Sequence, residues 1–103
     1  MGGQEEELAA ALAALPAEIR TMLAEDLPLD RQRCEEAFAA LRWGQLREQV
    51  HRIKGSAQFC HLQALQEICL RIEDKAGAGV APDSADMEIF RTEVTRVLAV
   101  LGT

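Results

Sequence analysis

Apolar residues recur at spacings of three, four and seven along most of this 103-residue chain. This spacing places them on one face of an α-helix, so we predict an all-α fold. Pro16, the pair Trp43-Gly44 and the run Gly77-Ala78-Gly79 interrupt the pattern and mark the ends of helical stretches. Since each stretch is apolar on one side only, none of these helices is stable in water until that side is packed.

The interruptions predict one short helix followed by four long ones. We predict helices at 5–14, 17–41, 45–58 and 62–75, and a last helix that is capped by Asp83 or Ser84. Pro28 lies inside the second helix and predicts a kink or a break there. Four long helices with short connections pack most simply as an antiparallel up-down four-helix bundle, with the short N-terminal helix on one end.

The chain, 1–103, is long enough for one domain and not for two. Hydrophobic residues make up 49% of it, and the low aromatic content of 4% suits helices packed through aliphatic side chains. We interpret Met1-Gly2-Gly3 as a remnant of cloning. The side chains that the helical period turns inward are Leu8, Leu12, Leu15, Ile19, Met22, Leu23, Leu27, Cys34, Phe38, Leu41, Leu46, Val50, Ile53, Ala57, Leu62, Leu65, Ile68, Cys69, Ile72, Met87, Phe90, Val94, Val97, Leu98 and Leu101.

The net charge of −6 argues against binding to nucleic acid and against docking on an anionic membrane, because both need a basic surface. No apolar run approaches the roughly 18 residues of a membrane span. The acidic start lacks the basic region of a secretory signal, so we expect a cytoplasmic protein. One stretch is locally basic, since Arg42, Arg47, Arg52 and Lys54 stand there with Glu48 as the one acid.

The cysteines are odd in number and form no C-x-x-C pair. Cys34 and Cys69 stand among apolar neighbours, which predicts buried free thiols in a reducing compartment.

His51 is predicted to lie on the outward face of the helix at 45–58. At about 100° per residue, the apolar residues of this helix fall within roughly 40° of Leu46, whereas His51 falls at roughly 140°. Lys54 and Gly55 follow on the same side. A glycine inside a helix costs about 1 kcal/mol relative to alanine, so its presence here favours a close approach by another protein surface, although a simple defect or a helix contact stays open.

This arrangement suits phosphoryl transfer. An exposed imidazole can accept a phosphoryl group on Nε2, and the added charge of close to −2 benefits from a nearby cation. Lys54 can reach that group, while Arg47 and Arg52 can screen it. Gly55 leaves room for the phosphoaspartate of a partner, which can also supply the divalent metal that the reaction needs. We predict no cofactor bound by this chain itself.

The run His51-x-Ile53-Lys54-Gly55-Ser56-Ala57 resembles the signature H-x-[LI]-K-G-[SA]-[SA] of histidine-containing phosphotransfer domains. The similarity continues through Leu65, Cys69, Ile72 and Glu73, and upstream through Glu25-Asp26-Leu27-Pro28, over about 80 residues. The resemblance implies a monomeric four-helix bundle that carries a phosphoryl group between receiver domains of response regulators or hybrid sensor histidine kinases.

The resemblance also implies a role for each matching position. His51 would be the phosphoacceptor, Lys54 would stabilise the phosphoryl group, and Gly55 would permit receiver docking. Ser56 would lie at the side of the helix, where it can bond the backbone. Glu73 would accept a hydrogen bond from Nδ1 of the histidine or pair with Lys54, unless it is simply solvated.

Four further positions are left open by the sequence. Gln58 either bonds a phosphoryl oxygen or faces water. Met22 and Phe59 are candidates for the apolar docking surface of this family, but the sequence favours the core for both. His61 stands where the family usually has glycine, which puts the turn after this helix in doubt.

Three other kinds of function fit the sequence less well. His51, Cys60 and His61 match no zinc spacing. No nucleotide loop or nucleophile motif indicates an autonomous enzyme, so another protein must phosphorylate His51. The chief alternative is a helical docking module that binds a receiver or kinase without carrying phosphate.

Overall fold

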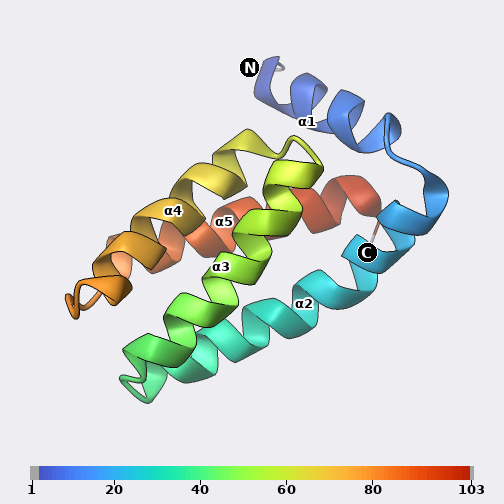
Figure 1. Ribbon diagram of the computed structural model, residues 1–103. Coiled ribbons are helices and arrows are strands. Elements are labelled where there is room, and N and C mark those ends of the chain that lie inside the picture. Colours follow the sequence, from blue (N-terminus) through green and yellow to red (C-terminus); the bar gives the residue numbers. More distant parts are fainter. Residues whose placement is uncertain (1–2, 103) are drawn as a thin grey trace.

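The computed structural model describes residues 3–102, apart from the side chain of Gln4, and all regular elements in that range are helices. They are α1 (Gly3–Ala13), α2 (Ala17–Ala39), α3 (Trp43–Phe59), α4 (Gln63–Gly77) and α5 (Ser84–Leu101) (Figure 1). Of the predicted cloning remnant, Met1 and Gly2 lie outside the described residues, and Gly3 begins α1.

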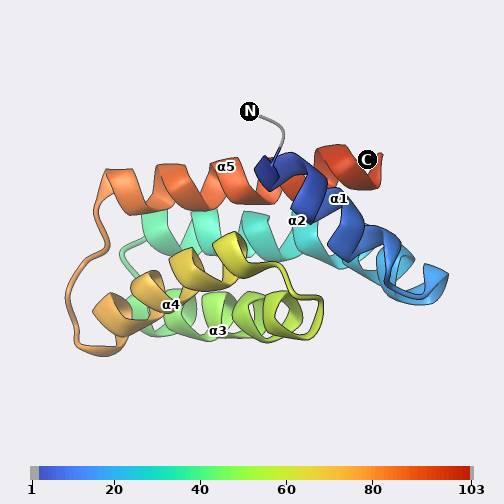
Figure 2. The same cartoon turned by 90° about the horizontal axis from the view of Figure 1, so that it is seen from above.

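Helices α2 to α5 form the predicted antiparallel four-helix bundle. Helix α3 packs on α2 and α4, and α5 packs on α4 and α2, so the four helices surround one core. Consecutive helices of the bundle run in opposite directions (Figure 1; Figure 2). Helix α1 packs on α5 across one end of the bundle, where Glu5 accepts a hydrogen bond of 2.7 Å from Arg96.

Aliphatic side chains fill the core, as the composition predicts. Phe90, in the middle of α5, is the largest of the fully buried side chains. The described core consists of Leu12, Leu23, Leu27, Cys34, Ala37, Leu46, Val50, Ile53, Ala57, Cys60, Leu62, Leu65, Ile68, Cys69, Ile72, Met87, Phe90, Val94, Val97 and Leu98. Most of the side chains predicted to point inward are therefore buried.

Three side chains for which a core position was predicted or favoured are exposed instead. Met22, Leu41 and Phe59 have exposed fractions of 51%, 70% and 67%. The helical period gives the angle of a side chain about its own axis, but not the position of the neighbouring helix. Met22 and Phe59 lie at the edges of α2 and α3, and Leu41 lies beyond the last residue of α2, Ala39.

The sequence predicts a kink or a break at Pro28. The break does not occur, because α2 is one continuous helix from Ala17 to Ala39 with Pro28 inside it. Proline removes one backbone donor from the helix. The buried side chains of Leu23, Leu27 and Cys34 lie on both sides of Pro28 and hold the helix against the core. Packing of this stripe therefore outweighs the loss of one hydrogen bond.

The three cysteines are free and buried, as predicted for Cys34 and Cys69. Burial raises the pKa of the Cys69 thiol to about 12 and also raises the pKa of Cys34. Both thiols are thus uncharged at neutral pH and behave as small apolar side chains.

A buried carboxylate fixes the start of α5 on α4. Asp83 caps α5 by accepting a hydrogen bond of 2.9 Å from the backbone N–H of Asp86, which confirms one of the two predicted caps. Asp86 itself is 2% exposed and accepts hydrogen bonds from Lys75 at 2.6 Å and from Arg71 at 3.4 Å. Burial would raise the pKa of Asp86, but these two hydrogen bonds outweigh it and hold that pKa below its ordinary value.

Helices α2, α3 and α4 end in the same kind of turn. The residue after each helix cap adopts a left-handed conformation, with φ of 58° at Leu41, 59° at His61 and 74° at Gly79. The closing backbone hydrogen bonds run from Arg42 N to Ala37 O, from Leu62 N to Ala57 O and from Val80 N to Lys75 O. These are Schellman motifs, in which glycine is the preferred residue. The turn that His61 put in doubt is therefore intact, with a histidine in a position that favours glycine.

Replacing His61 by glycine is expected to raise the free energy of unfolding by about 0.5–1 kcal/mol, because glycine adopts the left-handed conformation without a steric penalty. Urea denaturation measures this change. Leu41→Gly tests the same effect at the end of α2, and Gly79→Ala should act in the opposite direction. A His61→Gly variant less stable than the parent would contradict the assigned turn.

Candidate functional site

His51 lies in α3 on the face that points away from the core, as its place in the helical period predicts. Its side chain is 64% exposed. Val50 and Ile53, on either side of it in sequence, are buried at 0% and 1% exposure. The buried stripe of α3 therefore fixes the helix on the bundle and directs the imidazole to solvent.

Glu73 of α4 contacts both His51 and Lys54. One carboxylate oxygen lies 2.5 Å from Nδ1 of His51, and the other accepts a hydrogen bond of 2.5 Å from Nζ of Lys54. The side chains of Glu73 and Lys54 are only 12% and 21% exposed. The sequence left open whether Glu73 accepts from the imidazole or pairs with Lys54, and the structure shows both contacts.

The carboxylate of Glu73 also determines which nitrogen of His51 carries the proton. Burial would raise the pKa of Glu73, but the hydrogen bonds from Lys54 and His51 outweigh it and lower that pKa. An ionised carboxylate only accepts hydrogen bonds, so in the neutral imidazole Nδ1 carries the hydrogen and Nε2 has the free lone pair. Nε2 has no hydrogen-bond partner among residues 3–102.

The packing of α4 explains why Glu73 reaches this place. Cys69 and Ile72 are fully buried on the inner stripe of α4, which faces the core shared with α3. Glu73 follows Ile72 directly and lies one turn after Cys69, so it emerges at the border between the two helices. Its partners on α3, His51 and Lys54, are three residues apart and hence on one side of their helix.

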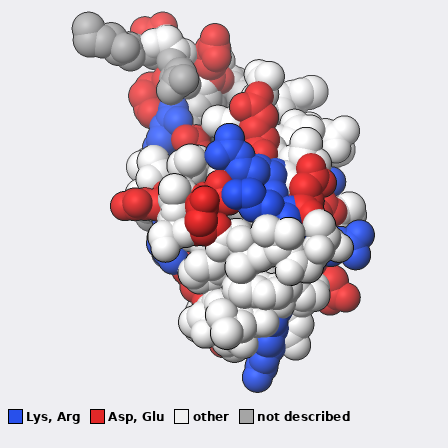
Figure 3. Space-filling view, turned by 90° about the vertical axis from the view of Figure 1, so that its left-hand side faces the viewer, with Lys and Arg blue, Asp and Glu red and all other residues white. Residues whose placement is uncertain are grey.

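The basic residues predicted around His51 are distributed over different sides of α3. Lys54 is bound to Glu73. The Arg47 side chain lies over Gly77 of α4, whose added Cβ would come within 3.1 Å of Arg47 Nε. Arg52 lines a groove on the side of α2. Figure 3 shows one face of the molecule, on which a group of basic side chains lies beside acidic ones. This acidic chain therefore has a locally basic patch on its surface.

Gly55, Ser56 and Gln58 are exposed on α3. A Cβ added at Gly55 would meet no atom within 4 Å, so the surface above this residue is open. The hydroxyl of Ser56 and the amide of Gln58 make no hydrogen bond with the residues that the structure describes. The backbone bond considered for Ser56 is thus not formed, and Gln58 faces solvent.

A groove between α2 and α3 borders His51, and we call it the α2–α3 groove. Its lining residues are Ile19, Met22, Leu23, Asp26, Leu27, Asp30, His51, Arg52, Ile53, Gly55, Ser56, Phe59 and Cys60. The exposed Met22 and Phe59 lie on opposite sides of it, on α2 and α3. Apolar surface thus lies beside an exposed imidazole and an open glycine.

The family model described as Hpt domain matches residues 18–100. The chain belongs to the Hpt domain family. It is 36% identical over 89 residues to the sensor histidine kinase GacS of Pseudomonas protegens, a match that covers 82% of this chain and 10% of that protein. No solved structure gives a significant match. Membership of the family identifies the general role of this Hpt domain as phosphotransfer.

The acidic side of the α2–α3 groove was not predicted from the sequence. Asp26 and Asp30 line the groove from α2, while Arg52 lines it from α3. In the sequence, Asp26 stands out only through the family resemblance, although its spacing of four from both Met22 and Asp30 places the three on one side of a helix. That spacing was the available signal.

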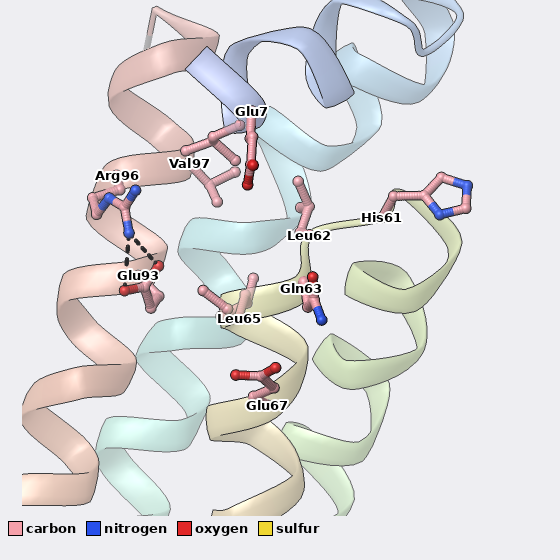
Figure 4. Close-up of a pocket in the computed structure, with 11 residues that line it drawn as sticks. Glu7, His61, Leu62, Gln63, Leu65, Glu67, Glu93, Arg96 and Val97 are labelled. Carbon is pink, nitrogen blue, oxygen red and sulfur yellow. Dashed lines mark hydrogen bonds and ion pairs between the residues drawn. The ribbon is translucent and has the colours of Figure 1, made fainter. Parts of the chain in front are cut away.

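A second groove of this Hpt domain lies beyond the end of α3, between α1, α4 and α5. Its cation, Arg96, is paired with Glu93 at 2.9 Å and with Glu5 at 2.7 Å. Figure 4 shows the imidazole of His61 pointing away from the groove, so it does not join the carboxylates there. Among residues 3–102 no group of three or more His, Cys, Asp or Glu side chains is placed to hold a metal.

Within the described range, no helix is both long enough and apolar enough to cross a membrane.

Proposed function

We propose that this Hpt domain carries a phosphoryl group on Nε2 of His51, accepting it from the phosphoaspartate of one receiver domain and passing it to another receiver. The observation that carries the proposal is the exposed imidazole whose Nδ1 is held by Glu73, with Lys54 on the same carboxylate. Nε2 makes no hydrogen bond with the described residues and the side chain is 64% exposed, so a partner can bring its phosphoryl group to this nitrogen.

In the proposed step, the lone pair of Nε2 attacks phosphorus while the bond to the aspartate oxygen of the receiver breaks. The electrons of that bond return to the aspartate, and the phosphoryl group stays on His51. Lys54, 21% exposed and three residues away, can neutralise part of the added charge. In the reverse step, a second receiver's aspartate attacks phosphorus and the electrons return to Nε2.

The Hpt domain needs little besides positioning for this chemistry, because phosphoryl transfer depends mainly on alignment and on charge neutralisation. A divalent metal such as Mg²⁺ would be supplied by the receiver. In this role the chain binds no cofactor of its own, has no kinase activity, acts as a monomer and meets its receivers in the cytoplasm.

Receiver docking would use the α2–α3 groove. Met22 and Phe59 give it apolar surface, and the open position above Gly55 lets a partner come close to His51. Aromatic side chains often dominate the affinity of such interfaces.

Phe59→Ala is therefore expected to weaken receiver binding by about 1–2 kcal/mol, or roughly 5- to 30-fold in Kd. Because the side chain is 67% exposed, the stability of the bundle should change little. Leu70→Ala on α4 is the matched control, since Leu70 is 46% exposed and does not line the groove. Calorimetric titration with a receiver compares the two variants. Equal losses of affinity in both would contradict docking at the groove.

The function is tested by incubating the chain with a panel of phosphorylated receiver domains. Label on the chain that is lost in acid and kept in base would identify phosphohistidine. Receiver binding with no uptake of label would instead support the docking module that carries no phosphate. Receivers from systems with sensor histidine kinases are the first choice, given the name of the matched relative.

A further inference from the structure

The contact of Glu73 with Nδ1 has a consequence for the phosphorylated state. We propose that Glu73 keeps the phosphorylated imidazole of His51 protonated on Nδ1, and that this makes the phosphoryl group easy to transfer and short-lived. The inference rests on the proposed function, in which His51 is the carrier. Glu73 is a positioning residue here, because it touches the imidazole and not the phosphoryl group.

The proton count of the transfer step leads to this inference. Glu73 Oε2 lies 2.5 Å from Nδ1 of His51, and because the ionised carboxylate only accepts, the neutral resting imidazole has its hydrogen on Nδ1. When the Nε2 lone pair forms the bond to phosphorus, no proton has to leave, so the ring becomes a cation. The ionised Glu73 faces this cation directly and stabilises it. When the Nε2–P bond later breaks, neutral imidazole is the leaving group, and it is a better leaving group than the imidazolate of a deprotonated ring.

Lys54 adds a second effect in the same direction. In the resting structure Lys54 Nζ donates to Glu73 Oε1 at 2.5 Å, so the cation that would hold the phosphoryl group is shared with a carboxylate. The negative charge of Glu73 therefore limits how strongly Lys54 can stabilise the phosphorylated state.

The other charged groups around His51 are less directly placed. On α3, Arg52 lines the α2–α3 groove and Arg47 lies over Gly77. On α2, Asp26 and Asp30 line the same groove as His51. Glu73 makes the one hydrogen bond to the imidazole among the described residues, so it is the group expected to control the ring proton.

Glu73→Gln is the direct test, because glutamine has the same shape and can still accept from Nδ1 but has no charge. The proteins are phosphorylated with phosphoramidate, so that loading does not depend on a receiver, and loss of phosphohistidine is followed from pH 5 to pH 9. At pH 8 the phosphohistidine of Glu73→Gln should live at least about fivefold longer than that of the parent. Near pH 5, where both rings are protonated, the two lifetimes should converge.

Glu67→Gln is the matched control, since it makes the same chemical change on the same helix at an exposed position away from His51. Its lifetime should follow that of the parent at every pH. Glu73→Ala, which leaves Nδ1 to water, should behave like Glu73→Gln, and this second variant guards against misfolding of the first.

Two results would overturn the inference: equal lifetimes of Glu73→Gln and the parent at pH 8, or a ratio that stays constant from pH 5 to pH 9. Either result leaves the proposed function intact if receivers still label His51. Conversely, failure of every receiver to label the chain would reject the proposed function, while the lifetimes after loading with phosphoramidate would still decide the role of Glu73.

Discussion

His51→Gln is expected to take up no detectable phosphoryl group from any receiver that labels the parent chain. Glutamine has no nitrogen lone pair able to form the phosphoramidate, and no other described imidazole has a carboxylate and a lysine beside it. The side chain is 64% exposed, so the free energy of unfolding should change by no more than about 0.5 kcal/mol. Labelling with radioactive phosphate measures the uptake. Urea denaturation followed by circular dichroism measures the free energy of unfolding.

His61→Gln provides the control for this substitution. His61 is exposed in the turn after α3, and Figure 4 shows its imidazole directed away from the neighbouring carboxylates. This variant should keep the uptake rate of the parent. Full uptake by His51→Gln, or loss of uptake by His61→Gln, would place the phosphoryl group on a different residue.

Gly55→Leu is expected to slow transfer from a receiver by at least about tenfold, since even small displacements of reacting groups are costly. The new side chain would stand in the open space above α3, where an added Cβ meets no atom within 4 Å. The bundle itself should not be strained. Leucine favours helix over glycine, so the variant should be more stable by up to about 0.8 kcal/mol.

Gly44→Leu is the matched control for Gly55→Leu. Gly44 lies in the first turn of the same helix, and its added Cβ also meets no atom within 4 Å. Its transfer rate should equal that of the parent. Rates measured by quenched-flow labelling separate the two positions, and an unchanged rate in Gly55→Leu would remove the argument that partners approach over this glycine.

Much of the fold could be predicted from the sequence, because each helix has a clear apolar stripe and a clear stop. The predicted bundle, its short N-terminal helix and the capping by Asp83 are confirmed. At Pro28 the predicted break does not occur, because the packing of Leu27 and Cys34 on either side holds α2 together despite one lost hydrogen bond.

The site could be predicted only in part. The exposure of His51 and the neighbourhood of Lys54 follow from spacing within one helix, so the sequence was sufficient for them. The bridge to Glu73 joins residues 22 positions apart on two helices, and only the family resemblance pointed to it.

The spacing of residues within one helix also does not predict how a side chain lies against the neighbouring helix. Arg47 extends over Gly77 rather than remaining free to screen His51. Met22 and Phe59 are exposed because they flank the α2–α3 groove, whose width depends on how the two helices pack.

The most direct test of the central claim is a relay with three components: a phosphorylated receiver, this chain and a second, unphosphorylated receiver. The label on the second receiver is measured over time. We predict that label passes through the chain and reaches the second receiver only when the chain has His51, with His51→Gln giving the background rate. Equal transfer with His51→Gln, or in the absence of the chain, would contradict the claim that His51 carries the phosphoryl group between receivers.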